Sequence, residues 1–255
     1  MKPHVLIIRA AGTNCDVETA HAFEVAGATV ERVYIDEVKK KKISAYQVIA
    51  LPGGFTYGDD IAAGKILANE IKYKLRNEFL EFLEKGNLII GICNGFQVLV
   101  KCGILPAFDH YFEQQSVSLV YNDSGRFEDR WIYMNVKNER CVFTREMADI
   151  ITLPVAHAEG KFVVKDEKTL EKIQEHIVFK YVDADGKSAG YPGNPNGSIM
   201  DIAGITDKTG RVLGLMPHPE RHLTYLHHPR HTREDHNVKG DGYYIFKNAV
   251  DYFKT

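Results

Sequence analysis

The sequence has no excess of charge of either sign. It contains 32 lysine and arginine residues against 34 aspartate and glutamate residues, for a formal net charge of −2. Proteins that bind nucleic acid or an anionic membrane through their overall charge carry a marked basic excess, which is missing here. We therefore expect neither nucleic acid nor a membrane surface among the partners of this chain.

Long apolar segments are also missing. A helix needs about 20 consecutive apolar residues to span a bilayer, and no apolar run in the sequence approaches that length. The start, from Met1 to Ile8, is a short apolar stretch that soon meets Arg9, and no small-residue cleavage site follows a long apolar core. We interpret this stretch as a first strand rather than an export signal, and we expect a cytoplasmic protein.

Cysteine is scarce, with four residues in a chain of 255. Cys15, Cys93, Cys102 and Cys141 show neither the CxxC spacing of a metal site nor the density of a disulfide framework. In a cytoplasm all four thiols would stay reduced, so one of them can serve as a reactive group.

The first hundred residues alternate between strand and helix patterns. Strands are expected at 5–8, 29–35, 48–51 and 88–92, and helices at 17–26, 66–85 and from 94 to 101. Later strands are expected at 117–120, 131–136, 162–164, 177–181 and 212–216, before a last helix at 243–253. This order predicts an α/β fold of three layers around a mostly parallel, doubly wound sheet. We expect one domain over residues 1–255, with the more antiparallel second half continuing the same sheet.

One pentapeptide, Gly91-Ile92-Cys93-Asn94-Gly95, places a thiol directly after a buried strand and before a helix. A tight strand-to-helix turn holds a nucleophile in a strained backbone conformation, and glycines at the flanking positions remove the collisions that side chains would cause. The helix N-terminus also favours a thiolate. A buried structural cysteine beside two turn glycines is the alternative, but the context favours Cys93 as a nucleophile.

A base and its orienting group are expected after the last strand. His218 and Glu220 are two residues apart, so their side chains point the same way in an extended backbone. Histidine transfers protons near neutral pH, and a neighbouring carboxylate fixes its tautomer. With Cys93 they form a candidate Cys-His-Glu triad. The N–H groups of Asn94 and of Gly54, at the end of the third strand, are candidate oxyanion donors.

These motifs together carry a family resemblance. The stretches 91–97, 52–59 and 216–221, with further matches at 12–16, 20–24, 122–131, 156–160 and 194–198, resemble the class I (triad) glutamine amidotransferases. Within that family the chain is most similar to the glutaminase subunits, of the PurQ type, of phosphoribosylformylglycinamidine synthase. The resemblance runs from about residue 5 to 221 and implies a single glutamine amidotransferase domain of flavodoxin-like type.

The resemblance also implies roles for individual residues. Cys93 would attack the side-chain amide of glutamine to give a glutamyl thioester and ammonia, while His218 transfers protons and Glu220 orients it. Gln97 matches the position that contacts the substrate glutamine, although a solvent-facing helix residue is the plain alternative. His157 and Glu159 lie where related enzymes line the glutamine pocket.

The implied partner is an ATP-dependent synthetase subunit of the PurL type, with a small PurS-type subunit as an optional third component. It would use the ammonia to convert formylglycinamide ribonucleotide to formylglycinamidine ribonucleotide in purine biosynthesis. No P-loop occurs in this sequence, so we expect no cofactor here, and ATP and magnesium on the partner. The loops 122–131 and 194–198 are candidates for the partner-facing surface. Two alternative hypotheses remain for the function. The chain could be a cysteine hydrolase of the same fold that acts on other amides or peptides, or a regulatory subunit without catalysis.

The segment 222–241 holds histidines at positions 222, 227, 228, 231 and 236. Their irregular spacing, with no cysteine nearby, favours a solvated or partner-facing loop over a metal site. We therefore expect no metal in this chain.

Overall fold

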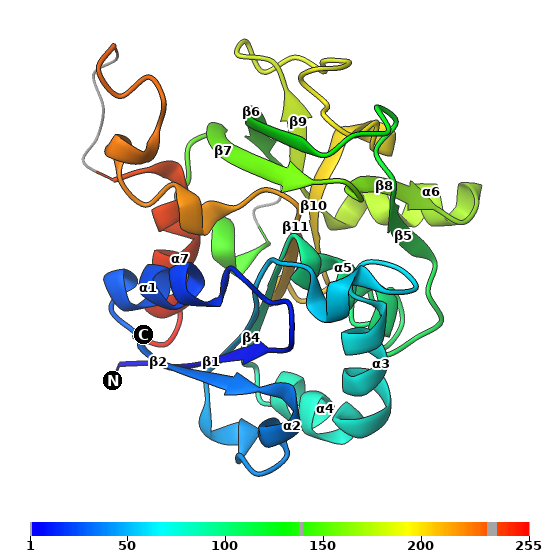
Figure 1. Ribbon diagram of the computed structural model, residues 1–255, viewed down its shortest axis with the longest axis vertical. Helices are drawn as coiled ribbons and strands as arrows, with labels where there is room; N and C mark the ends of the chain where they lie inside the picture. Colours follow the sequence, from blue (N-terminus) through cyan, green and yellow to red (C-terminus); the bar gives the residue numbers. More distant parts are fainter. Residues whose placement is uncertain (1, 138–139, 234–238, 255) are drawn as a thin grey trace.

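The apolar runs of the first half form the parallel half of a nine-stranded sheet (Figure 1). Five strands pair in parallel in the order β2-β1-β3-β4-β11. They are β1 (His4–Arg9), β2 (Thr29–Tyr34), β3 (Val48–Leu51), β4 (Leu88–Ile92) and β11 (Val212–Leu215). The central strands β3, β4 and β11 are buried along their whole length, which explains why they read as continuous apolar runs in the sequence.

The computed structural model describes residues 2–137, 140–233 and 239–254. Within these residues, no helix combines the length and the apolar composition needed to cross a membrane.

The other half of the sheet is antiparallel. Beyond β11 the order continues β10-β9-β6-β7, and every pairing from β11 onward is antiparallel. These strands are β10 (Ile202–Thr206), β9 (Ile177–Val182), β6 (Glu128–Val136) and β7 (Ile150–His157). The expected α/β class is confirmed, with a mixed sheet that changes from parallel to antiparallel pairing at β11.

Two strands of the second half leave the main sheet, against the expectation that this half only continues it. β5 (Val117–Val120) and β8 (Lys161–Val164) pair with each other in an antiparallel ribbon. The ribbon packs against α5 (Asn94–Cys102), where the rings of Phe96 and Phe162 stack with their centroids 6.3 Å apart.

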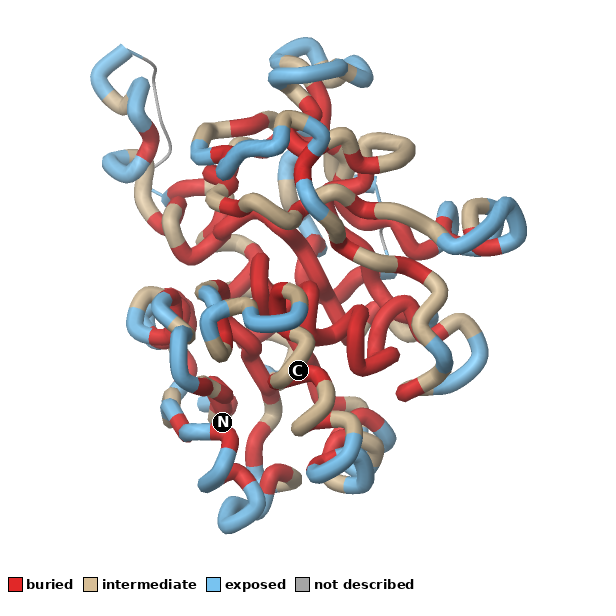
Figure 2. Tube along the Cα trace, turned by 45° about the vertical axis from the view of Figure 1, so that its right-hand side comes forward, coloured by how far each residue is buried: buried red, intermediate tan, exposed pale blue. Residues whose placement is uncertain are grey.

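Helices cover both faces of the parallel half and complete the three layers (Figure 1). α1 (Asp16–Ala26) packs against α7 (Asp241–Asp251) on one face, and α3 (Lys65–Lys74) packs against α5 on the other. The short helix α2 (Ile35–Val38) contacts β1 and β2, and α6 (Glu167–Ile173) contacts β8. Figure 2 shows the buried residues concentrated in the central strands and in α5, whereas exposed residues follow the loops.

The helix expected over residues 66–85 is two helices. α3 ends at Lys74 and α4 (Arg76–Glu84) begins after Leu75, whose φ of −128° and ψ of 12° are not helical. Leu75 is itself buried, so the apolar spacing runs through the break without interruption. Periodicity alone could not reveal it, because no glycine or proline marks the position.

The sequence pattern does not predict two further strands, β7 and β10. β7 contains Pro154, which lacks an N–H and is therefore tolerated in a strand at the edge of a sheet. β7 is such an edge strand, paired with β6 alone. β10 is short and centred on Gly204, where an added Cβ would lie 2.8 Å from the carbonyl oxygen of Gly214 on β11.

The approach of α5 to the sheet depends on Gly95. A Cβ added at this residue would lie 1.9 Å from the carbonyl oxygen of Leu51 on β3, a distance that no real structure allows. The helix can therefore lie this close to β3 only because residue 95 has no side chain.

We predict that Gly95→Ala lowers the free energy of unfolding by about 1–3 kcal/mol or more, because α5 must move away from β3. Gly190→Ala is the matched control, since no heavy atom lies within 4 Å of the added Cβ there, and it should stay within about 0.5 kcal/mol of the wild type. Urea unfolding measures both. Equal stability of Gly95→Ala and the wild type would contradict the packing argument.

Candidate active site

Cys93 occupies a strained turn between β4 and α5. Its φ of 51° and ψ of −107° are rare for a residue with a side chain, and a conformation of this kind costs on the order of 1–3 kcal/mol. Its backbone N–H donates to the carbonyl oxygen of Leu215 at 2.8 Å. A Cβ added at Gly91 would lie 2.6 Å from the carbonyl oxygen of Gly95, so the first glycine is also required by the turn.

His218 and Glu220 follow β11, the parallel neighbour of β4. Because parallel strands end at the same edge of a sheet, the two residues reach the turn that holds Cys93. His218 Nδ1 and Glu220 Oε1 are 2.6 Å apart, and both side chains are buried. The three expected triad residues therefore converge. A Cβ added at Gly53 would lie 2.8 Å from His218 Cε1 and 3.4 Å from Cys93 Cβ, so both side chains crowd the same glycine.

The backbone of the loop after β11 is fixed by the edge strand β7. The N–H of His218 donates to the carbonyl oxygen of Pro154 at 2.8 Å. Cys93 Sγ lies 3.7 Å from the carbonyl oxygen of Ala156, two residues farther along the same strand. β7, which the sequence reading missed, therefore forms one wall of the site.

The charge state of His218 is set by its neighbours. Burial alone would lower the pKa of His218, but the charges of Glu220 and Cys93, together with interactions with the thiols of Cys15 and Cys93, raise that pKa well above 6.5. His218 Nε2 is buried and makes no hydrogen bond to the described residues. The ring is therefore positioned by Nδ1 and keeps Nε2 available for proton transfer.

Asn94 and Gln97 are held in a buried network at the start of α5. Asn94 Oδ1 accepts from the hydroxyl of Thr56 at 2.7 Å, and its Nδ2 donates to Asp59 Oδ1 at 3.1 Å and to Gln97 Oε1 at 3.0 Å. Gln97 Nε2 in turn donates to the carbonyl oxygen of Glu159 at 2.5 Å. Gln97 is thus buried, which excludes the solvent-facing alternative.

A cavity of about 40 Å³ lies beside Cys93. The predicted residues that line it with Cys93 are Gly54, Gln97, His157 and Glu159. Asn94 contributes the first N–H of α5, one of the donors that a helix leaves without an internal partner. This volume is far below the roughly 300 Å³ or more that is typical of small-molecule pockets, so the cavity is narrow in this conformation.

His157 stands out among the cavity residues. Burial, reinforced by the nearby charge of His218, lowers the pKa of His157 to about 3, so its ring is neutral at physiological pH. Neither ring nitrogen makes a hydrogen bond to the described residues. A neutral imidazole with both nitrogens unpartnered can donate one hydrogen bond and accept another from a ligand.

Two buried asparagines of the loops expected to face a partner point inward, whereas Asp123, Arg126 and Asp129 of the first loop are exposed. Asn122 Nδ2 donates to the carbonyl oxygen of His157 at 2.8 Å, and its Oδ1 accepts from the N–H of Gly160 at 3.0 Å. Asn196 Nδ2 donates to the carbonyl oxygen of Gly160 at 2.9 Å. The motifs at 122–131 and 194–198 therefore fix the turn at 157–160 that lines the cavity.

Cys15 lies at the triad, although no glycine-flanked strand-to-helix turn surrounds it in the sequence. The side chain is buried at the N-terminus of α1, and Cys15 Sγ would be 3.1 Å from a Cβ added at Gly53. Arg221 Nη2 lies 3.3 Å from this sulfur, and Arg221 Nε donates to Glu18 at 3.0 Å. Burial raises the pKa of the Cys15 thiol, although the interaction with His218 opposes the shift. The one signal in the sequence was the position of Cys15 within the motif at 12–16.

The described part of the histidine-rich segment packs onto β6. The ring of Trp131 meets His222 and His228 edge-on, with centroids 4.9 and 4.7 Å away, and His222 Nδ1 is 2.8 Å from the carbonyl oxygen of Thr152. His236 lies outside the described residues. The described histidines of this segment thus contribute to packing and to local hydrogen bonds.

We predict that His218 keeps its proton at neutral pH and loses it only well above pH 6.5, because the neighbouring negative charges raise its pKa. Glu220→Gln removes the largest raising cause and should shift the titration to lower pH. Histidine NMR titration measures both, with His218→Asn to assign the signal. A wild-type titration at or below 6.5, or no shift in Glu220→Gln, would contradict the role given to Glu220.

The chain matches known proteins over nearly its whole length. A family model described as the CobB/CobQ-like glutamine amidotransferase domain matches residues 2–253. The phosphoribosylformylglycinamidine synthase subunit PurQ of Dehalococcoides mccartyi is 49% identical over 255 residues, which cover 98% of each chain. The subunit of the same name from Methanococcus maripaludis is 45% identical, over 98% of this chain and 97% of the relative.

A solved structure agrees with these relatives. A chain in the structure of PurLQS from Thermotoga maritima superposes with a TM-score of 0.76 at 32% identity, and 99% of this chain and 100% of that chain are covered. The fold, the motifs and the relatives lead to one assignment. The chain belongs to the CobB/CobQ-like glutamine amidotransferase domain family and, within it, to the PurQ subunits of phosphoribosylformylglycinamidine synthase.

Proposed function

We propose that this chain is the glutaminase subunit of a phosphoribosylformylglycinamidine synthase, with Cys93, His218 and Glu220 as its catalytic triad. One observation carries the proposal. The 2.6 Å contact of the buried His218–Glu220 pair lies beside a cysteine held at a positive φ, in a chain 49% identical to a PurQ subunit. Geometry of this kind suits nucleophilic attack on an unactivated amide.

The first half-reaction forms a thioester. Cys93 Sγ attacks the side-chain carbonyl carbon of glutamine as a thiolate, while its proton is held on His218 Nε2. The N–H groups of Gly54 and Asn94 stabilise the oxyanion that develops, a contribution worth on the order of 3–4 kcal/mol per donor in other enzymes. The imidazolium then protonates the amide nitrogen, the C–N bond breaks, and ammonia leaves.

The second half-reaction releases glutamate. His218 takes a proton from water, the resulting hydroxide attacks the thioester carbon, and the C–S bond breaks to restore Cys93. Glu220 holds the ring through Nδ1 in both steps and stabilises its positive charge. The raised pKa of His218 suits the step in which the ring carries the proton.

Gln97, His157 and Glu159 form the binding site for glutamine in this proposal. The neutral ring of His157 and the carbonyl group of Glu159, which is already fixed by Gln97, present hydrogen-bonding groups beside Cys93. The near-neutral chain charge suits a zwitterionic substrate, because no large field of one sign opposes its entry.

The partner in this proposal is a synthetase subunit of the PurL type, with a small PurS-type subunit as a third component. The support is the similarity to a chain of PurLQS from Thermotoga maritima. The ammonia passes to the synthetase, which holds ATP and magnesium and aminates formylglycinamide ribonucleotide. We place the complex in the cytoplasm, where the four free thiols stay reduced, and we treat residues 1–255 as one amidotransferase domain.

We predict weak glutamine hydrolysis by the isolated chain, because the cavity of about 40 Å³ beside Cys93 is small for a glutamine side chain. Addition of the synthetase should raise glutamate release about tenfold or more, as expected when an open state is a minor population in the free subunit. Glutamate release is measured with and without the partner, for the wild type and for Cys93→Ala.

Two outcomes of this assay would overturn separate parts of the proposal. Wild-type glutaminase activity in Cys93→Ala would exclude Cys93 as the nucleophile. ATP-dependent turnover of another acceptor, with none of formylglycinamide ribonucleotide in the reconstituted complex, would exclude the assigned reaction while leaving the glutaminase assignment intact.

A further inference from the structure

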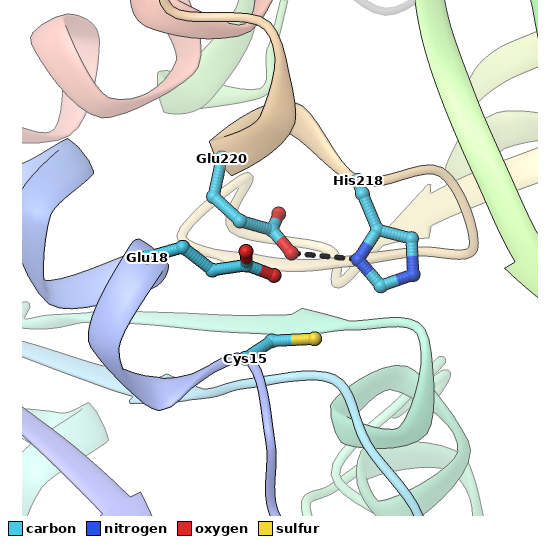
Figure 3. A group of neighbouring side chains, drawn as sticks. All are labelled: Cys15, Glu18, His218 and Glu220. Atoms are coloured by element: carbon cyan, nitrogen blue, oxygen red, sulfur yellow. Dashed lines mark hydrogen bonds and ion pairs between the residues drawn. The ribbon is translucent and has the colours of Figure 1, made fainter.

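Four potential metal ligands from two separate elements converge, and two of them belong to the proposed triad (Figure 3). Cys15 and Glu18 come from the start of α1, and His218 and Glu220 follow β11. One ligand atom of each residue lies within 4.8 Å of those of the other three. The set is a thiol, an imidazole and two carboxylates, the donor types that Zn²⁺ takes in its four-coordinate sites.

Two polar atoms of this group are buried without a hydrogen-bond partner among the described residues. They are His218 Nε2 and Glu220 Oε2. Nε2 has a role in proton transfer, but no catalytic step uses Glu220 Oε2. A buried carboxylate oxygen that lacks a donor is costly, and a bound cation would satisfy it. Glu220 uses only Oε1 toward His218, so Oε2 takes no part in that contact.

The group already holds one positive charge, the guanidinium of Arg221. Its Nη2 lies 3.3 Å from Cys15 Sγ, and its Nε lies 3.0 Å from Glu18 Oε1. The side chains of Arg221 and Glu18 are 35% and 38% exposed, so the guanidinium can move into solvent without crossing a buried region. Arg221 therefore occupies the place of a cation and would compete with one.

From these observations we propose that Cys15, Glu18, His218 and Glu220 form an inhibitory site for Zn²⁺ or a similar soft divalent cation. Cys15, rather than Cys93, supplies the thiolate. On binding, the Cys15 thiol and the His218 imidazolium each release a proton to solvent, Cys15–metal and His218–metal bonds form, and Arg221 moves away. The redox state of the protein does not change. Affinity rises with pH because the thiol must lose its proton.

The inhibitory effect rests on the proposed function, whereas the existence of the site does not. A cation bound to a ring nitrogen of His218 withdraws the lone pair that accepts the proton from Cys93, or disrupts the contact with Glu220 that orients the ring. Either change removes the base from the triad. Glutamine hydrolysis would then stop without any modification of Cys93.

Cobalt(II) is the probe for the site, since it takes the tetrahedral geometry of zinc and reports thiolate ligation by a charge-transfer band. The full chain is titrated with Co²⁺ in a Cys93→Ala background, which removes the second thiol at the triad. We expect the band to saturate at one Co²⁺ per chain and to disappear on addition of Zn²⁺. Absence of the band would overturn the site.

Paired variants in the same background identify the ligands. Cys93→Ala/Cys15→Ser should lose the band, whereas Cys93→Ala/Cys141→Ser should keep it, because Cys141 lies outside the group. Glu18→Gln should weaken Co²⁺ binding by about tenfold or more, and Arg221→Gln should strengthen it because the competing charge is removed. Each variant is first checked for native near-ultraviolet circular dichroism. A band that persists without Cys15 would overturn the assignment of the thiolate.

Inhibition is tested separately with Zn²⁺ on the reconstituted complex. Glutamate release by wild-type Cys93 protein should fall with Zn²⁺ and recover with a chelator, and Cys15→Ser should need about tenfold more Zn²⁺ for the same fractional loss. Equal zinc sensitivity of the two proteins would overturn the inhibitory role. If no glutaminase activity exists at all, the proposed function fails, and the cobalt spectra still decide whether the site exists.

Discussion

The site depends on the parallel pairing of β4 with β11. The two strands are more than a hundred residues apart in the sequence, and their pairing brings their ends together. The turn at Cys93 and the loop of His218 therefore meet at one edge of the sheet. The N–H of Cys93 extends the same ladder by its bond to Leu215. If this register shifted by one residue, the thiol and the imidazole would no longer face each other.

The strain at Cys93 is sustained by packing around it. α5 can begin at Asn94 only because Gly95 lets the helix contact β3 and because Gly91 leaves room for the turn. The antiparallel half supplies the opposite wall, where the buried asparagines 122 and 196 hold the turn at 157–160 against Cys93. The catalytic residues thus come from the parallel half, and the residues that enclose them come from both.

The elements that sequence reasoning located correctly are those whose signal is local. The strands around Cys93 are continuous apolar runs, and Gly91 and Gly95 mark the turn directly. β7 was missed because Pro154 is tolerated only at a sheet edge, and edge position is a property of the complete sheet. The break at Leu75 has no marker, since the residue keeps the apolar period of the helices that flank it.

The position of Cys15 could not be predicted because it depends on how α1 meets the loop after β11. Two thiols therefore lie near one histidine, and we assign covalent chemistry to Cys93 alone. The most direct test mixes the reconstituted complex with glutamine, quenches it in acid and locates the glutamyl group by peptide mass spectrometry. We expect a glutamyl thioester on the peptide that contains Cys93. A glutamyl group on the peptide that contains Cys15, or turnover with no trapped thioester on Cys93, would contradict this assignment.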